Sequence, residues 1–430
     1  MCTMSNFCSS VVFGFSTYRN TSEVLKTTKQ FLKLSRLLRR GKMDLSSTVY
    51  DAIVVGAGIE GSSIAYNLAK RGQRTLLIEQ FPLPHSRGSS HGKSRITRYA
   101  YEKSFYVRMM VDAFPMWAQL EKEAKTRLFV NCGLLNFHYN QSEGLERMTS
   151  ALRECQVPHQ VLTSTEVQSR FPQIKNGEDY CALWDPQGGA LKADKCLKAF
   201  QDVFQQHGGV VHDEEPVTHI SPGKVITVAT TKSHYRAHNV VIAAGPWSEK
   251  LCTSLKLQVF LKPLRSLVLY WKVNEEFINL YDPDSFPCFI DSRTSDDVHM
   301  YGFPSLEYPG MVKICLNRDF VIDPDDRDKL ENDGVMTEEV KKKVALTFKH
   351  LASMPSIREY CICTDTPDKH PYIDKHPAYP NIVLAVGFSG HGFKLAPAVG
   401  KAVTELVLKE PLSYNMEPFK LNRFTTKANL

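Results

Sequence analysis

The stretch that decides the fold is residues 49–79, VYDAIVVGAGIEGSSIAYNLAKRGQRTLLIE. Residues 50–55 are a short apolar run that stops abruptly at a glycine, which predicts a buried parallel strand. Three glycines with the spacing G-x-G-x-x-G follow. Such glycines allow a tight turn, a close approach of backbone N–H groups to a diphosphate, and close packing of the next helix. They are Gly56, Gly58 and Gly61.

A helix and a second strand continue this unit. Residues 61–71 predict a helix whose free N–H groups and positive dipole end face the diphosphate. Residues 74–78 predict the second strand, and Glu79 stands at its end. A carboxylate at this place accepts hydrogen bonds from a ribose diol and repels a 2′-phosphate. We therefore predict a site for FAD or NAD and exclude NADP.

Further strand and helix signals follow along the chain. Apolar residues at helical spacing predict helices, and short β-rich runs bounded by glycine or proline predict strands. Alternating β-like runs between 261 and 317 predict a largely antiparallel sheet. We expect a loop at 80–98, helices at 106–123, 191–207, 337–351 and 394–408, and strands at 133–139, 237–244 and 381–387.

The net charge of +7 is located in the N-terminal segment. Residues 1–42 carry eight Lys or Arg and one Glu, and 8 − 1 = +7, so the remaining residues have no net charge. We therefore do not expect the part of the chain after residue 42 to bind nucleic acid. The segment is basic and rich in Ser and Thr, and Met43 follows it. It is either a mitochondrial targeting peptide or an extension upstream of a second start site.

Two classes of protein are not expected from the remaining composition. No run approaches the ~18–20 consecutive apolar residues of a membrane span. The eleven cysteines are scattered, without a C-x-x-C pair or a metal-like Cys/His spacing. We therefore expect a reduced, intracellular protein without a metal site.

Five motifs in chain order resemble the monomeric sarcosine oxidase family of amine-oxidising flavoproteins. The resemblance runs from residue 49 to the C-terminus and rests on residues 49–79, SSHGKSRITR (89–98), MYGFPS (300–305), CICTDTPD (361–368) and GFSGHGFKLAP (387–397). It implies an α/β fold with a discontinuous Rossmann-like FAD-binding domain and a mainly antiparallel substrate domain. The expected segments are an extension at 1–48, an FAD domain at 49–129, 196–263 and 365–420, a substrate domain at 130–195 and 264–364, and a tail at 421–430.

The resemblance also implies how the cofactor is held. Family members tether one FAD per chain through a cysteine in C-x-x-T-x-T-P-D, which falls here on Cys361. The neighbouring Cys363 matches no tethering role. The implied cofactor-binding residues are Gly56, Gly58, Gly61, Glu79, His91, Ser94, Arg95, Cys361, Gly390, Gly392 and Lys394.

Four residues correspond to the family's catalytic positions. Arg98 and Lys394 align with the cations that bind the substrate carboxylate, which suits a guanidinium fork and a point charge. Tyr301 aligns with a tyrosine that borders the amine, and Lys313 with the lysine that activates oxygen. A fixed cation at that place stabilises superoxide.

The implied reaction is the oxidation of secondary α-amino acids to imines, with O2 reduced to H2O2. A family histidine falls on Asn317 and a family tyrosine on Cys363, and both replacements are smaller. We therefore expect a pocket that admits L-pipecolate and L-proline as well as sarcosine, which yields glycine and formaldehyde. The alternatives are a dehydrogenase that passes electrons to a protein acceptor and a nucleotide-binding module without catalysis.

The last three residues, Ala428, Asn429 and Leu430, resemble a peroxisomal import signal whose basic middle residue is replaced by Asn. We expect a peroxisomal import receptor as a partner, and a peroxisomal location. The basic leader favours the mitochondrion as the alternative. The family resemblance implies a monomer.

Overall fold

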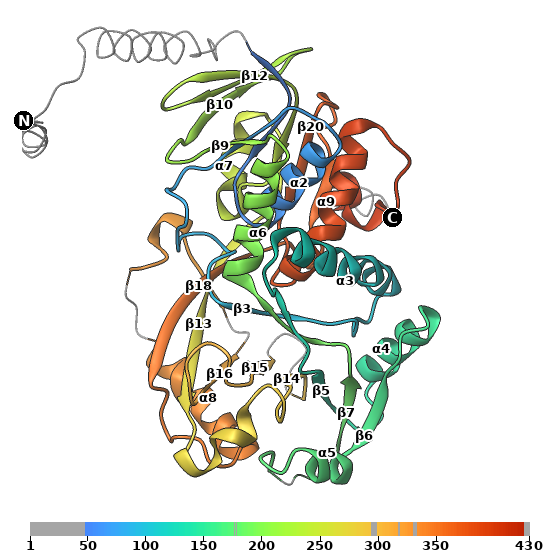
Figure 1. Ribbon diagram of the computed structural model, residues 1–430, viewed down its shortest axis with the longest axis vertical. Coiled ribbons are helices and arrows are strands. Elements are labelled where there is room, and N and C mark those ends of the chain that lie inside the picture. Colours follow the sequence, from blue (N-terminus) through green and yellow to red (C-terminus); the bar gives the residue numbers. More distant parts are fainter. Residues whose placement is uncertain are drawn as a thin grey trace, which may run out of the picture. The chain divides into compact units, whose positions relative to one another are not determined.

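The computed structural model describes residues 48–175, 177, 179–293, 299–316, 319–329 and 333–424 (Figure 1). Within these residues the strands form an eight-stranded, a nine-stranded and a three-stranded sheet. The predicted α/β fold with a Rossmann-like part and a second, sheet-rich part is confirmed. The predicted domain boundaries remain predictions.

The eight-stranded sheet contains the decisive stretch. Its strand order is β10-β11-β12-β1-β2-β9, with β20 beside β12 and β19 beside β20. The segment β20-β12-β1-β2-β9 is parallel throughout, as a Rossmann-like sheet requires. The strands are β1 (Val49–Val55), β2 (Thr75–Ile78), β9 (Val210–His212), β10 (Val217–Ser221), β11 (Ile226–Thr230), β12 (His234–Ile242), β19 (Tyr372–Lys375) and β20 (Ile382–Val386).

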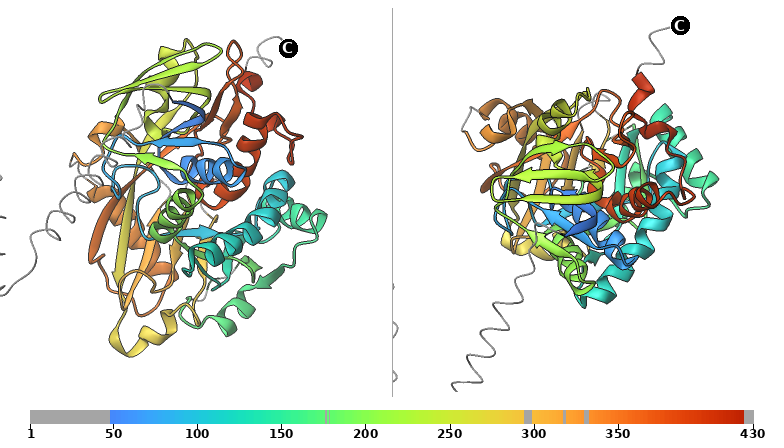
Figure 2. Two further views of the ribbon diagram at one scale, coloured as in Figure 1. Left: turned by 45° about the horizontal axis from the view of Figure 1, so that its top comes forward. Right: turned by 90° about the horizontal axis from the view of Figure 1, so that it is seen from above.

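Helices cover one face of this sheet. The helix α2 contacts β1 and β2, and α6 and α9 lie against α2 (Figures 1 and 2). Along β1, Ala52 and Val54 pack under these helices, whereas Ile53 and Val55 pack on the opposite face. This alternation is what a strand buried on both faces requires. The helices on this side are α2 (Ile59–Lys70), α3 (Ser104–Ala124), α6 (Ala193–Gln206) and α9 (Gly392–Leu408), whereas α7 (Ser248–Ser254) packs through Cys252 on the opposite face.

The glycine turn after β1 has no space for a side chain at the first or the third glycine of the motif. Gly56 has φ +101°, and a Cβ added there would lie 2.4 Å from the Ala243 carbonyl oxygen. A Cβ on Gly61 would lie 1.9 Å from the Gly56 carbonyl oxygen. The first and third glycines of the motif therefore allow the turn and the helix packing that their spacing predicts.

The nine-stranded sheet forms the second part of the fold. Its order is β17-β13-β16-β15-β14-β5-β7-β6, with β18 also paired to β13. The pairs are antiparallel except for β5 with β14, and α8 lies against β16. The elements are β5 (Leu134–Tyr139), β6 (Gln160–Thr163), β7 (Tyr180–Asp185), β13 (Lys262–Lys272), β14 (Cys288–Asp291), β15 (Met300–Phe303), β16 (Met311–Leu316), β17 (Asp319–Val321), β18 (Ile357–Asp365), and the helices α4 (Glu143–Glu154), α5 (Ser164–Arg170) and α8 (Gly334–Thr347).

Two predicted segments, the loop at 80–98 and the helix at 337–351, are wrong near their C-terminal ends. The expected loop at 80–98 contains β3 (Ser94–Thr97), which pairs with β8 (Gly189–Lys192), and β8 also pairs with β4 (Phe129–Val130). The partner strand lies about a hundred residues away along the chain, so local composition carries no sign of it. The helix expected at 337–351 ends at Thr347, because Phe348 is extended and forms a β-bridge with Ile174.

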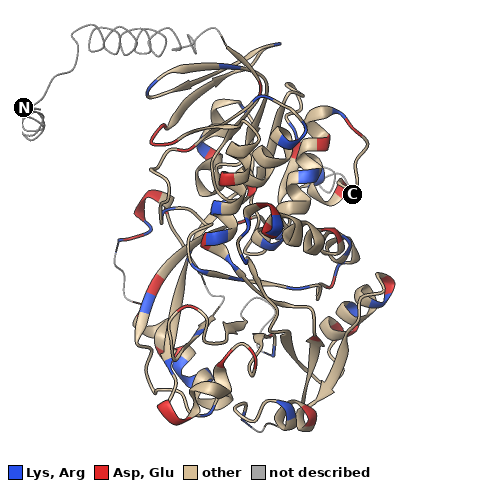
Figure 3. Cartoon of the chain, in the orientation of Figure 1, with Lys and Arg blue, Asp and Glu red and all other residues tan. Residues whose placement is uncertain are grey.

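Charged side chains of both signs are interspersed over the helices and loops (Figure 3). Many form exposed pairs, such as Lys198 with Asp202 at 2.8 Å on α6. Exposed pairs of this kind contribute ~0–1 kcal/mol each, so they do not determine the fold. No helix in the described part of the chain has the length and apolarity that a membrane crossing requires.

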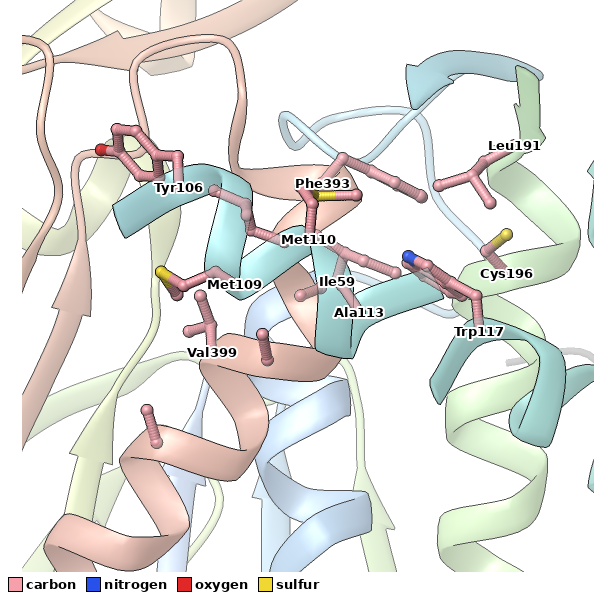
Figure 4. Packing of buried hydrophobic residues seen from close by; sticks show 14 of the residues in the cluster. Ile59, Tyr106, Met109, Met110, Ala113, Trp117, Leu191, Cys196, Phe393 and Val399 are labelled. Atoms are coloured by element: carbon pink, nitrogen blue, oxygen red, sulfur yellow. The ribbon is translucent and has the colours of Figure 1, made fainter. Parts of the chain in front are cut away.

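The core beside the glycine turn is built around α3. Its buried residues Tyr106, Met110 and Trp117 pack against α9 and α6, as Figure 4 shows. The Trp117 indole N–H donates to the Lys394 carbonyl oxygen at 3.0 Å, which fixes the first turn of α9. The core thus holds the N-terminus of α9 in place beside the N-terminus of α2.

Candidate active site

A cavity of about 1420 Å³ lies where the two large sheets meet the N-termini of α2 and α9. This volume exceeds the ~300–1,000 Å³ of sites for single small ligands, so the cavity has room for a cofactor and a substrate. Every predicted site residue except Gly61 lines it: Gly56, Gly58, Glu79, His91, Ser94, Arg95, Arg98, Tyr301, Lys313, Cys361, Gly390, Gly392 and Lys394. Gly61 instead packs against the Gly56 carbonyl group within the glycine turn.

At one end of the cavity, Glu79 holds the glycine turn in shape. Its carboxylate accepts the Ala57 N–H at 2.8 Å and the Phe81 N–H at 3.1 Å, and His85 Nε2 lies 3.5 Å away. The Ser90 hydroxyl accepts the Ile59 N–H at 2.8 Å. The contact of Glu79 with a ribose diol remains a prediction, whereas its bond to the turn is a structural role that the motif did not reveal.

Glu60 is an unexpected acid in the same turn. It is only 8% exposed, and neither carboxylate oxygen has a hydrogen-bond partner among the described residues. A Cβ on Gly392 would lie 2.8 Å from Glu60 Oε1, so the acid faces the N-terminus of α9. Burial raises the pKa of Glu60 well above its usual value. Glu60 stands inside GAGIEG, but the glycine spacing of that motif does not predict its burial.

Two cations face the cavity on the side of α9. Lys394 is 6% exposed, and its ammonium contacts the His391 carbonyl oxygen at 3.5 Å. Arg98 stacks on the Tyr101 ring at 5.0 Å, and its Nε has no hydrogen-bond partner in the described part of the chain. Burial and the neighbouring Arg98 charge lower the pKa of Lys394 well below its usual value. A half-buried guanidinium and a buried amine, whose charged forms a nearby anion would stabilise, therefore lie at one place in the cavity.

Two histidines near these cations add no positive charge. Burial and the charge of Lys394 lower the pKa of His391 to about 3, so its imidazole is neutral. His391 Nε2 lies 3.0 Å from the Lys369 carbonyl oxygen, which favours an N–H on that nitrogen. Burial likewise lowers the pKa of His299, another residue of the cavity wall, to about 4. The cationic groups at this place are therefore the side chains of Arg98, Lys394 and the neighbouring Arg95, whose charge also lowers the pKa of Lys394.

A second buried cation, Lys313, lies on β16. Its ammonium forms an ion pair with Glu307 at 3.0 Å and contacts the Ser94 hydroxyl at 3.4 Å. The Tyr270 hydroxyl donates to the other Glu307 oxygen at 2.7 Å. Burial raises the pKa of Glu307, but Lys313 and these hydrogen bonds outweigh burial and lower it overall. Lys313 and Ser94 are predicted from the sequence, whereas Glu307, which lies six residues before Lys313, is not.

Cys361 lies on β18, where it pairs with Ser266 of β13 and lines the cavity half-buried. Cys363 lines the same wall two residues on, opposite Leu264. The β18 ladder therefore places both thiols along the cavity, and the geometry alone does not choose between them as a tether. The choice of Cys361 remains a prediction from the family motif.

The loop before β3 is held by Arg95. Its guanidinium donates to the Ser94 and Ser89 carbonyl oxygens at 2.8 and 2.9 Å and lies 5.5 Å from the Phe393 ring. Burial and the charge of Arg327 lower the pKa of His91 in this loop.

Several of the residues named from the sequence lie outside the described residues. These are Asn317, the leader at 1–42 and the tail residues Ala428, Asn429 and Leu430.

These residues fit a bound dinucleotide. The glycine turn leaves no space for a Cβ at Gly56, and two helix N-termini meet at the cavity, as a diphosphate requires. Two thiols and the buried Lys313 ammonium also line the cavity. The fold and the cavity therefore place the chain in the dinucleotide-binding class of proteins.

Comparison with known proteins specifies this class. Residues 51–406 match the family model described as FAD dependent oxidoreductase. The chain is 43% identical over 396 residues to the peroxisomal sarcosine oxidase of Mus musculus, which covers 90% of this chain and 100% of the relative. It is 33% identical over 400 residues to the monomeric sarcosine oxidase of Bacillus sp. (strain B-0618), which covers 89% of this chain and 98% of the relative.

A solved structure shows the same fold at lower identity. The L-proline dehydrogenase from P. horikoshii superimposes with a TM-score of 0.77, at 23% identity, over 88% of this chain and 98% of that one. The chain belongs to the FAD dependent oxidoreductase family and, within it, to the sarcosine oxidase group. It is an FAD-dependent enzyme.

Proposed function

We propose that the protein oxidises secondary α-amino acids, with sarcosine, L-pipecolate and L-proline as substrates, to imines and reduces O2 to H2O2. The observation that carries this proposal is the pairing of the half-buried Arg98 with the buried Lys394 in the cavity that also contains the glycine turn. The pair suits a substrate carboxylate. The relatives named sarcosine oxidase support the amine as the group that is oxidised.

The chain's own residues bind and orient the substrate. The Arg98 guanidinium offers two N–H groups to the carboxylate, and Lys394 adds a point charge. Tyr301 lines the cavity on β15 and borders the amine. The neutral His391 leaves the carboxylate as the partner of the two cations. When bound, FAD accepts two electrons from the substrate and delivers them to O2.

Lys313 acts on the oxygen side of the reaction. It is a buried cation in a low-dielectric wall, where a positive charge stabilises a developing oxygen anion far better than it would in water. Glu307 and Ser94 fix the ammonium in place. A dehydrogenase that uses a protein acceptor has no need of this cation.

Cys361 is proposed as the covalent attachment site of one FAD per chain, which would hold the cofactor on the β18 side of the cavity.

We further propose that the protein is monomeric and peroxisomal, and that the import receptor binds the tail residues Ala428, Asn429 and Leu430. The peroxisomal names of the mammalian relatives support this location over the mitochondrion.

The experiment that tests the proposal measures peroxide formation by the purified protein with each of the three amino acids. Substrate-dependent H2O2, with kcat/KM for L-pipecolate or L-proline at least comparable to that for sarcosine, is expected from the smaller Cys363. Oxidation of the amine with an artificial electron acceptor but without H2O2 in air would establish the dehydrogenase instead. A flavin that none of the three reduces would establish a module without this catalysis.

A further inference from the structure

Two thiols outside the groups used above lie in contact. The Sγ atoms of Cys132 and Cys288 are 3.7 Å apart, and both cysteines are free. Cys288 is fully buried at the start of β14, whereas Cys132 is half-buried just before β5. A disulfide bond is about 2.0 Å long, so side-chain rotation that brings the sulfurs about 1.7 Å closer joins them.

The backbone holds the two thiols in this position. The Cys288 N–H donates to the Gly133 carbonyl oxygen at 3.1 Å, and Cys288 pairs with Leu134 in the parallel ladder of β5 and β14. Gly133 has φ +76°, which turns the chain immediately after Cys132. The thiol contact is therefore part of a hydrogen-bonded sheet and not a chance encounter of loops.

Cys288 also lies near Lys313. Side chains alternate along a strand, so Cys288 shares a face of β14 with Ile290, which lines the cavity. On the next strands, Phe303 pairs with Lys313, and both line the same cavity. Cys288 is two strands from Lys313, a separation of about 10 Å at ~4.8 Å per strand.

We propose that Cys132 and Cys288 form a modification site, at which hydrogen peroxide converts the two thiols into one disulfide. The proposal rests on the proposed function, which generates this oxidant near Lys313. Cys132 is the thiol that reacts first, because it is the less buried of the two. The hydrogen bond from Cys288 lowers the pKa of Cys132, which favours the reactive thiolate.

The reaction balances in two steps. The Cys132 thiolate attacks one peroxide oxygen, the O–O bond breaks, and hydroxide leaves as water after protonation, so that Cys132 becomes a sulfenic acid. The Cys288 sulfur then attacks the sulfenic sulfur, the S–O bond breaks, and a second water leaves. The two thiols lose two electrons and two protons, and one H2O2 becomes two waters.

The test exposes the holoenzyme, without substrate, to added H2O2 and maps its peptides without reduction. We expect one cross-linked pair that joins Cys132 to Cys288. Cys132→Ser abolishes it, and Cys155→Ser, a change at another half-buried free cysteine, leaves it intact. In Cys288→Ala, dimedone captures the sulfenic acid at Cys132.

Two results would overturn the site: oxidation of Cys132 to sulfinic or sulfonic acid with Cys288 still reduced, or survival of both thiols while other cysteines oxidise. Peroxide formation from substrate is measured separately in a peroxidase-coupled assay. A disulfide without such peroxide supports the site and contradicts the proposed function. Peroxide without the disulfide contradicts the site alone.

Discussion

The ammonium of Lys313 lies 3.0 Å from the carboxylate of Glu307, and both side chains are only 5% exposed. A buried cation costs free energy unless a counter-charge and hydrogen bonds surround it. Glu307 supplies the counter-charge, and Ser94 and Tyr270 complete the network. The cavity wall therefore contains an ammonium group with a matched counter-ion where the proposed reaction needs a cation.

Glu307→Gln leaves Lys313 as a buried charge without a counter-ion. The free energy of unfolding is expected to fall by ~3–5 kcal/mol, as for other broken buried pairs. Urea titration at neutral pH measures it. The matched control is Lys198→Met, which removes the exposed Lys198–Asp202 pair and changes the free energy by at most ~0.5 kcal/mol. Equal effects of the two variants would show that burial does not isolate Lys313.

Glu60 makes stability depend on pH in a defined direction. Its pKa is raised in the folded protein because the carboxyl group is buried without a partner. The folded state therefore favours the protonated acid, and stability is lost as pH rises from the unfolded value near 4.5 toward the raised pKa. Glu60→Gln keeps the shape without the ionisation. Its Tm is expected to exceed that of the wild type at pH 7 and to equal it at pH 4; a difference independent of pH would refute this account.

The glycine turn is tested by a pair of substitutions at positive φ. Gly56→Ala places a Cβ 2.4 Å from the Ala243 carbonyl oxygen, so the turn must open and FAD is expected to be lost. Gly72→Ala has a similar backbone, φ +76°, but nothing lies within 4 Å of its Cβ, so the cost is about 1 kcal/mol and FAD stays bound. Flavin absorbance per mole of purified protein measures both. Full flavin content in Gly56→Ala would mean that the turn does not hold the cofactor.

Much of this architecture could be predicted from short-range pattern. The glycine spacing predicts the turn between β1 and α2, and local periodicity predicts the strands on either side of it and the helix before Gly208. The structure contains β1, α2, β2 and α6 at these places. The pairing of β3 with β8 could not be predicted in this way, because each strand's partner is remote in sequence.

The same limit applies to the site. Arg98, Lys313 and Lys394 could be identified from motifs, but Glu307 could not, because its role arises only when the chain brings it to Lys313. Glu60 was visible in the motif, yet its burial without a partner depends on the approach of Gly392 from α9. The contact of Cys132 with Cys288 likewise requires the β5–β14 ladder.

The proposed tether is tested by acid precipitation. If Cys361 carries the flavin, the yellow colour stays in the pellet of the wild type and moves to the supernatant for Cys361→Ser. Cys363→Ser is the matched control, since it lies on the same wall two residues away. Retention in Cys361→Ser and release in Cys363→Ser would move the attachment to the second thiol.

The central claim is that Arg98 and Lys394 bind the carboxylate of an amino acid that reduces the flavin. Anaerobic mixing of the wild type with sarcosine, L-pipecolate or L-proline, followed by the visible band of oxidised flavin, tests it most directly. We predict a saturable loss of the band in the wild type. In Arg98→Gln/Lys394→Gln, which remains yellow, we predict that the apparent Kd rises at least ~100-fold, because two charge-assisted contacts of ~1.5–3 kcal/mol each are removed. Unchanged Kd in the double variant, or a band that none of the three amino acids affects in the wild type, would contradict the claim.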